Sequence, residues 1–77
     1  MNDVQLRMAR VALKLGVRDM AELTGVSHFT IVRMEAGQAV KPATVAKVRA
    51  ALEAAGIVFI EANGGGPGVR MKEPPPA

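Results

Sequence analysis

The stretch MAELTGVS, residues 20–27, together with Ile31 a few residues later, decides the fold. Ala21 is small, as is required where two helices cross closely. Gly25 adopts positive φ without strain, which a tight turn between helices needs. Val26 fills the corner at the turn, and Ile31 anchors the following segment on the core. These separate steric roles at fixed offsets predict two short helices that pack against each other around the turn.

The boundaries of these two helices follow from residues that start and stop helices. The helix before the turn is predicted over residues 17–23 and the helix after it over residues 28–36. The Ser27 hydroxyl is placed to accept from backbone amides in the first turn of the later helix, and Gly37 is placed to end that helix. Two short helices joined by a glycine turn form a helix-turn-helix.

One further helix is predicted on each side of this unit. The earlier helix covers residues 3–15, with Asn2 or Asp3 as its cap and Gly16 as its stop. Its apolar residues recur at helical spacing: Val4, Met8, Val11, Ala12 and Leu15, with Leu6, Ala9 and Leu13 widening the stripe. The later helix begins at Pro42, which suits a first helical turn. Its expected buried stripe is Val45, Val48, Leu52 and Ala55.

The chain changes character after residue 56. Residues 57–60 are β-branched and aromatic and predict a strand, while residues 63–68 are rich in glycine and predict a turn. Residues 69–72 are expected to return as a second strand. The expected organisation is a helix-turn-helix domain over residues 1–56, a strand or hairpin over residues 57–72 and a disordered tail over residues 73–77.

Composition narrows the class of function. The chain has 77 residues, a formal net charge of +3 and no cysteine, so one small domain is expected and disulfides and thiolate chemistry are excluded. A single histidine, His28, has no carboxylates at ligand spacing, so neither a metal nor a cofactor is expected. No nucleophile–base pair or membrane-length apolar run is found. These features predict a small cytoplasmic binding module that is not an enzyme.

The helix-turn-helix pattern resembles the Cro/C1-type (XRE-like) family of phage and bacterial transcriptional regulators over about residues 6–52. The resemblance implies a mainly α fold: a four-helix lambda-repressor-like DNA-binding domain, here with a C-terminal strand or β-hairpin in place of the family's fifth helix. It also implies an ion pair between Arg10 and Glu35. Gly16 and Val17 depart from the family, which commonly has Ser or Thr and then Gln there.

In this family the second helix of the unit lies in the major groove and presents its outer face to base edges. The residues expected to contact bases are His28, Phe29, Val32 and Arg33. Arg33 matches guanine, and the two apolar side chains match thymine methyl groups. The alternatives are a phosphate contact or an idle surface charge for Arg33, a solvated His28, and a rotated helix that packs Phe29 and Val32 inside.

Phosphate contacts are expected around the same face, where they add affinity without sequence information. The candidates are Val17, through its backbone amide, Arg18, Ser27, Thr30, Lys41 and Lys47. Residues 33–49 carry four positive charges and one negative charge, so the net surplus of the chain is concentrated in this segment. A solvated face of the last helix would have the same composition.

One such domain contacts few bases, so a homodimer that reads two half-sites is expected. The predicted dimer interface is the strand segment: Ile57, Val58, Phe59 and Ile60. The alternative is a hairpin that folds onto its own helices. The expected partners are double-stranded operator DNA, a second copy and, for an activator, RNA polymerase. The other candidate function is a protein-binding module, such as an antitoxin or antiactivator, with little DNA binding.

Overall fold

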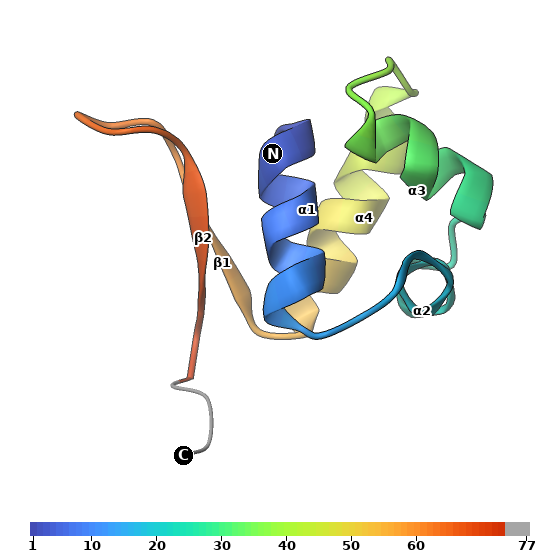
Figure 1. Cartoon of the computed structure of the whole chain (residues 1–77), viewed down its shortest axis with the longest axis horizontal. Helices are drawn as coiled ribbons and strands as arrows, with labels where there is room; N and C mark the ends of the chain where they lie inside the picture. The colour runs from blue at the N-terminus through green and yellow to red at the C-terminus, as the bar shows by residue number, and fades with distance from the viewer. Residues whose placement is uncertain (74–77) are drawn as a thin grey trace.

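The structure is a computed structural model that describes residues 1–73. Four helices are followed by a two-stranded antiparallel sheet (Figure 1). The elements are α1 (Asp3–Ala12), α2 (Val17–Thr24), α3 (His28–Glu35), α4 (Pro42–Ala54), β1 (Ile57–Ile60) and β2 (Gly68–Met71). The predicted fold class, mainly helical with a hairpin after the fourth helix, is confirmed. The proposed tail falls almost entirely on residues 74–77, which lie outside the described part of the chain.

A single core is formed by side chains from every element except β2, which adds a half-buried valine. The buried apolar residues are Leu6, Ala9, Met20, Ile31, Met34, Val48, Leu52, Ile57 and Phe59. On α4 the predicted positions Val48 and Leu52 are buried, whereas Ala55 lies beyond the helix and is exposed. On α2, Met20 and Thr24 are buried and Leu23 is exposed; the Thr24 hydroxyl donates to the Met20 carbonyl oxygen at 2.8 Å, which satisfies this buried polar group.

The prediction of which face of α1 is buried is wrong, because the observed buried face is rotated about the helix axis relative to the predicted one. Val4, Met8 and Val11 are exposed, whereas Leu6 and Ala9 are fully buried. The physical reason is that α1 is packed on two sides, by α3 and by the hairpin, so its buried surface is broader than one stripe and includes a polar residue. A prediction from apolar periodicity assigns a polar residue such as Gln5 to the solvent-exposed face of the helix.

The end of α1 also differs from the prediction. The helix ends at Ala12, and Lys14 adopts a left-handed conformation with φ of 58°. The Leu15 amide then donates to the Arg10 carbonyl oxygen at 3.0 Å, which satisfies the helix end without a glycine. Gly16 instead precedes α2, where its amide donates to the Asp19 carboxylate at 2.9 Å. The residue expected to stop one helix therefore begins the next.

The hairpin folds onto its own helices. β1 and β2 pair in register, with Ile57 opposite Met71 and Phe59 opposite Val69. Ile57 and Phe59 are buried in the core, and the Arg49 guanidinium carbon lies 5.0 Å from the centre of the Phe59 ring. Two of the four residues predicted to contact a second copy are therefore covered within the chain. Val58, which is half-buried, and Ile60, which is exposed, remain on the outer side.

Gln5 on α1 attaches the hairpin to the helical body. This buried side chain donates from Nε2 to the carbonyl oxygens of Ile60 and Gly68, each at 3.0 Å. Its Oε1 accepts from the Asn2 amide at 2.9 Å, and the Asn2 side chain in turn caps the helix by accepting from the Gln5 amide. One amide therefore joins the start of α1 to both strands at the point where Ile60 and Gly68 face each other.

Candidate nucleic-acid interface

The turn between α2 and α3 has the geometry that its residue types require. Gly25 lies in the left-handed region with φ of 71°, and Thr24 accepts from the Val26 amide at 3.3 Å. Ile31 and Met34 anchor α3 on the core. Their burial sets the rotation of α3 about its axis, and this rotation decides which side chains face outward.

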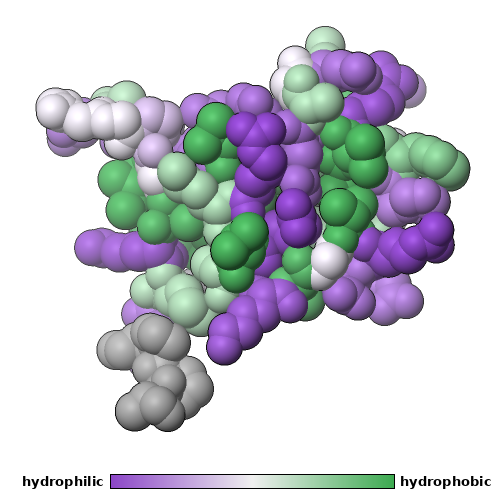
Figure 2. Space-filling view, in the orientation of Figure 1, coloured by the Kyte–Doolittle hydropathy of each residue, from purple (hydrophilic) through white to green (hydrophobic). Residues whose placement is uncertain are grey.

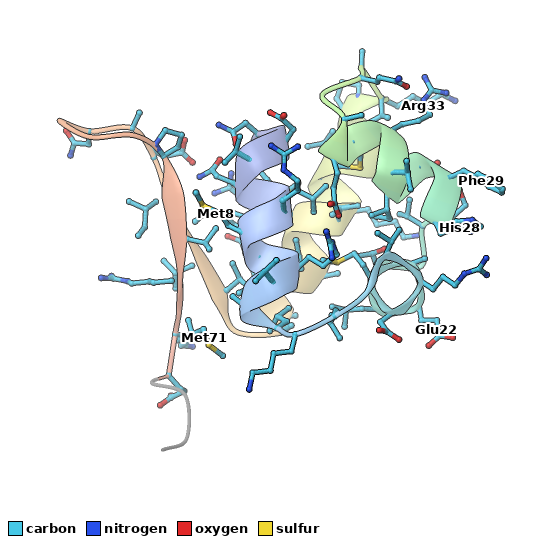
Figure 3. All side chains as sticks on the ribbon, viewed as in Figure 1. Met8, Glu22, His28, Phe29, Arg33 and Met71 are labelled. Atoms are coloured by element: carbon cyan, nitrogen blue, oxygen red, sulfur yellow. The ribbon has the colours of Figure 1, made fainter. Side chains whose placement is uncertain are left out.

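The outer face of α3 carries the four residues predicted to contact bases. Phe29 is 71% exposed and Val32 is 50% exposed, and Arg33 is also exposed. His28 is half-buried, and its ring centre lies 4.1 Å from that of Phe29. Figure 3 shows His28, Phe29 and Arg33 along the side of α3 that faces away from α1 and the hairpin. The alternative of a rotated helix that packs Phe29 and Val32 inside is wrong.

An ion pair joins α1 to the end of α3. Arg10 donates from Nε to Glu35 Oε2 at 2.8 Å and from Nη2 to Glu35 Oε1 at 2.9 Å. The hydrogen bond that Arg10 donates to Glu35 raises the pKa of Arg10, against the opposing effect of burial. The Glu35 side chain is nearly buried, so this two-pronged contact supplies partners for a carboxylate that has lost most of its water.

A second arginine, Arg7, holds the same helix end, and its role was missed from the sequence. Its Nη1 donates to the backbone carbonyl oxygen of Glu35, which is one of the unpaired groups at the C-terminus of α3. Its Nη2 lies 3.8 Å from Asp3 Oδ2, one helical turn earlier. The arginines at positions 7 and 10 are three residues apart on α1, and this spacing is the signal that both face one neighbour.

The predicted phosphate-contacting residues differ in how exposed they are and in which groups surround them. Arg18 is exposed and Val17 is half-buried at the start of α2, where the Asp19 carboxylate already accepts from the Gly16 amide. This carboxylate places a negative charge at the helix end that was expected to receive a phosphate. Asp19 was not singled out from the sequence, although an acidic residue in a first helical turn commonly caps a helix.

Ser27 and Thr30 form a small hydroxyl pair at the start of α3. Ser27 Oγ accepts from the Thr30 amide at 3.3 Å, and the two hydroxyl oxygens lie 3.0 Å apart. Both hydroxyls keep further hydrogen-bonding capacity, since each oxygen has two lone pairs. They lie at the same end of α3 as His28 and Phe29, which are the first two residues of the helix.

Of the two lysines, Lys47 lies within α4 and Lys41 directly precedes it. Lys47 Nζ donates to the Gly25 carbonyl oxygen at 3.3 Å, so Lys47 supports the turn between α2 and α3. Lys41 is the exposed residue that precedes α4, and its side chain makes no capping hydrogen bond. The structure therefore brings Lys47, in the middle of α4, to the turn and leaves Lys41 at the N-terminal end of the helix.

Within residues 1–73, no group of three histidine, cysteine, aspartate or glutamate side chains has the geometry to hold a metal ion. None of the helices in this part of the chain combines the length and the apolar character needed to span a membrane.

Comparison with known protein families agrees with the helix-turn-helix arrangement of α2 and α3. Residues 4–57 match the model of a family described as a helix-turn-helix domain. The match covers α1 to α4 and ends at the first residue of β1. A search of curated proteins found no match. Domains of this kind are generally found in DNA-binding regulators. The chain belongs to the helix-turn-helix domain family.

Proposed function

We propose that this protein is a sequence-specific transcriptional regulator of the Cro/C1-type that binds double-stranded DNA with α3 in the major groove. The single observation that carries the proposal is the split of α3 into two faces. Ile31 and Met34 are buried, whereas Phe29, Val32 and Arg33 face outward on the side away from the core. Large apolar groups gain nothing from exposure to water, so a partner surface that covers them accounts for their position.

The outward residues match the chemistry of base edges in the major groove. The Arg33 guanidinium fits guanine O6 and N7 with two parallel hydrogen bonds, which contribute about 1–3 kcal/mol of discrimination between bases. Phe29 and Val32 fit the methyl group of thymine, and the His28 ring stacks beside Phe29. Three of the four side chains therefore combine one directional contact with two apolar contacts, and His28 lies beside them at the start of α3.

Phosphate contacts are proposed around this face. Ser27 and Thr30 lie at the N-terminus of α3, where backbone amides and hydroxyls point toward an incoming anion. Arg18 is exposed and carries its charge at the start of α2, where it offsets the carboxylate of Asp19. The Val17 amide, Lys41 and Lys47 complete the proposed set, with Lys47 acting from beside the turn.

The regulator is proposed to act as a homodimer on two half-sites one helical turn apart. One α3 helix reads only a few base pairs, so two copies are needed for tight specific binding. Binding over a promoter would repress transcription, and binding upstream with a contact to RNA polymerase would activate it. A small regulator of this kind also suits control of its own gene.

The proposal is tested by selection of binding sites from a library of randomised duplex DNA. The expected result is a symmetric pair of half-sites that contains guanine and thymine. Replacement of thymine by uracil at the selected positions removes only the methyl group. This change is expected to weaken binding of the wild-type protein and to leave the double variant Phe29→Ala, Val32→Ala unaffected. Failure to enrich any duplex at low salt would overturn the proposal.

A second candidate function is a protein-binding module. The specific observation in its favour is the combination of an apolar outer face on α3 with the carboxylate of Asp19 at the start of α2. Salt dependence separates the two candidates, because each neutralised phosphate lowers the slope of log affinity against log salt by about 0.9 for duplex DNA. A protein partner bound through Phe29 and Val32 would be held with little dependence on salt.

A further inference from the structure

Three apolar side chains on α1 are left uncovered by the rest of the described chain. Val11 is 66% exposed, Met8 is 40% exposed and Val4 is exposed to a similar degree as Met8. Together with Arg7 and Ala12 they line a shallow groove on the outer side of the helix. The space-filling view shows hydrophobic patches over α1, bordered by hydrophilic residues (Figure 2). Exposed apolar side chains that are grouped along one groove are a candidate interaction site.

One of the two open edges of the sheet, that of β2, belongs to the strand that packs against α1. The sheet has two strands, so each strand pairs with its neighbour on one side and has an open edge on the other side. α1 packs against β2, whereas α4 packs against β1. Figure 1 shows the same arrangement, with α1 and β2 drawn in front of α4 and β1. Figure 3 shows the Met8 side chain on the side of α1 toward the hairpin, so this residue of the stripe lies close to β2.

We infer that this surface, formed by Val4, Met8 and Val11 with the open edge of β2, is the interface with a second copy of the chain. The stripe is nearly symmetric about Met8, since Val4 lies four residues before it and Val11 three residues after it. An antiparallel copy of α1 therefore places Met8 against Met8 and Val4 against Val11. A two-fold axis makes such a contact self-complementary.

The same axis also suits the strand edge. Two β2 strands related by a two-fold axis pair antiparallel, and their backbone groups then form the ladder that an open edge lacks. A stable interface buries roughly 800 Å² on each partner. The described chain has an accessible surface of 4989 Å². Three partly exposed side chains supply only part of the area that such an interface needs, so the stripe and the strand edge are required together.

This interface differs from the one expected at residues 57–60, and it leaves the outer face of α3 free. A continuous four-stranded sheet places both helical bodies on one side of the sheet, because Ile57 and Phe59 of each copy point to that side. The two α3 helices then face the same way, as two half-sites of one duplex require. This consequence rests on the proposed function, whereas the dimer itself does not.

The test is sedimentation equilibrium of the full chain without DNA, over a wide range of concentrations. The wild-type protein is expected to be a dimer. Met8→Glu places two carboxylates together at the axis and is expected to raise the dimer dissociation constant about 30-fold or more. Leu23→Glu on α2 and Ile60→Glu on the outer side of the hairpin are the matched controls, since both residues are as exposed as Met8. Both controls are expected to remain dimers.

A second variant keeps the test independent of folding defects. The chain has no cysteine, so Met8→Cys introduces a single thiol at the proposed axis. A short bis-maleimide is expected to link two copies of Met8→Cys efficiently and two copies of Leu23→Cys poorly. A monomeric wild-type protein, or a dimer weakened by Ile60→Glu and not by Met8→Glu, would overturn the interface. A dimer that binds no DNA would overturn the proposed function and leave the interface standing.

Discussion

α1 holds two neighbours by different chemistry. On one side it holds α3 through charged groups, the Arg10–Glu35 ion pair and the hydrogen bond from Arg7 to the Glu35 carbonyl. On the other side it holds the hairpin through the neutral amide of Gln5, with two backbone carbonyl oxygens as acceptors. The polar contact to α3 therefore depends on the identity of three side chains, whereas the polar contact to the hairpin depends on one.

Because the two contacts of α1 differ in chemistry, substitutions can distinguish the contact to α3 from the contact to the hairpin. Removal of one charge of a nearly buried pair leaves the other without a partner, which costs more than the pair itself contributed. Removal of the Gln5 amide leaves neutral carbonyl groups near the surface, which water can reach in part. The hairpin should therefore tolerate loss of its polar contact better than α3 does, provided that its apolar contacts remain.

The largest effect is expected from loss of the apolar contact of the hairpin. Phe59→Ala removes a buried ring and leaves a cavity, with an expected loss of about 3 kcal/mol in the free energy of unfolding. Urea denaturation followed by circular dichroism measures this change. Ile60→Ala is the control on the exposed side of the same strand, and a similar loss in that variant would contradict the assignment of the buried face.

A smaller loss is expected from the charged contact to α3. Arg10→Met leaves the Glu35 carboxylate without its main partner, and an expected cost of about 2 kcal/mol allows for the partial exposure of Arg10. The double variant Arg10→Met, Glu35→Leu should recover part of this loss, since no lone charge remains. The same urea titration tests both, and a double variant that is less stable than Arg10→Met would show that the charges do not act as a pair.

Gln5→Ala is expected to cost about 1–2 kcal/mol, because two carbonyl groups lose their donor. The loss should be local, so hydrogen exchange of the β1 and β2 amides is the suitable measurement. Faster exchange is expected in the strands and little change in α3. The control is Gln38→Ala, which alters an exposed glutamine. Equal acceleration in α3 and in the hairpin would argue against a local role for Gln5.

The smallest expected effect concerns the start of α3. Ser27→Ala removes the cap that accepts from the Thr30 amide and is expected to cost about 1 kcal/mol. Thermal unfolding measures this loss. Asn63→Ala in the exposed turn of the hairpin is the control, and an equal loss there would show that Ser27 does not act as a helix cap.

The turn between α2 and α3 was predictable because its requirements are local. Gly25 adopts a positive φ, Ser27 caps the next helix, and Ile31 lies one turn further on the buried side. Each requirement concerns residues a few positions apart, so the sequence pattern contains all the information. The outward direction of Phe29 and Val32 followed from the burial of Ile31 in the same way.

The buried face of α1 was not predictable by the same means. The hydrogen-bond partners of Gln5 are 55 and 63 residues away in the chain. Both partners are backbone carbonyl oxygens, which every residue type carries, so no residue type in the sequence indicates them. The left-handed conformation of Lys14 has no glycine to signal it. The placement of Ile57 and Phe59 against the chain's own helices likewise depends on packing between distant segments. The local sequence pattern therefore did not determine whether these residues pack within the chain or against a second copy.

The position of DNA on α3, rather than elsewhere on the protein, is tested most directly by two exposed basic residues. Arg33 lies on the outer face of α3, whereas Lys14 lies between α1 and α2 and belongs neither to the proposed DNA contacts nor to the proposed dimer interface. Fluorescence anisotropy with a selected duplex should show at least about tenfold weaker binding for Arg33→Ala, equivalent to about 1.4 kcal/mol, and little change for Lys14→Ala. Equal losses in both variants, or a loss only in Lys14→Ala, would contradict binding of DNA by α3.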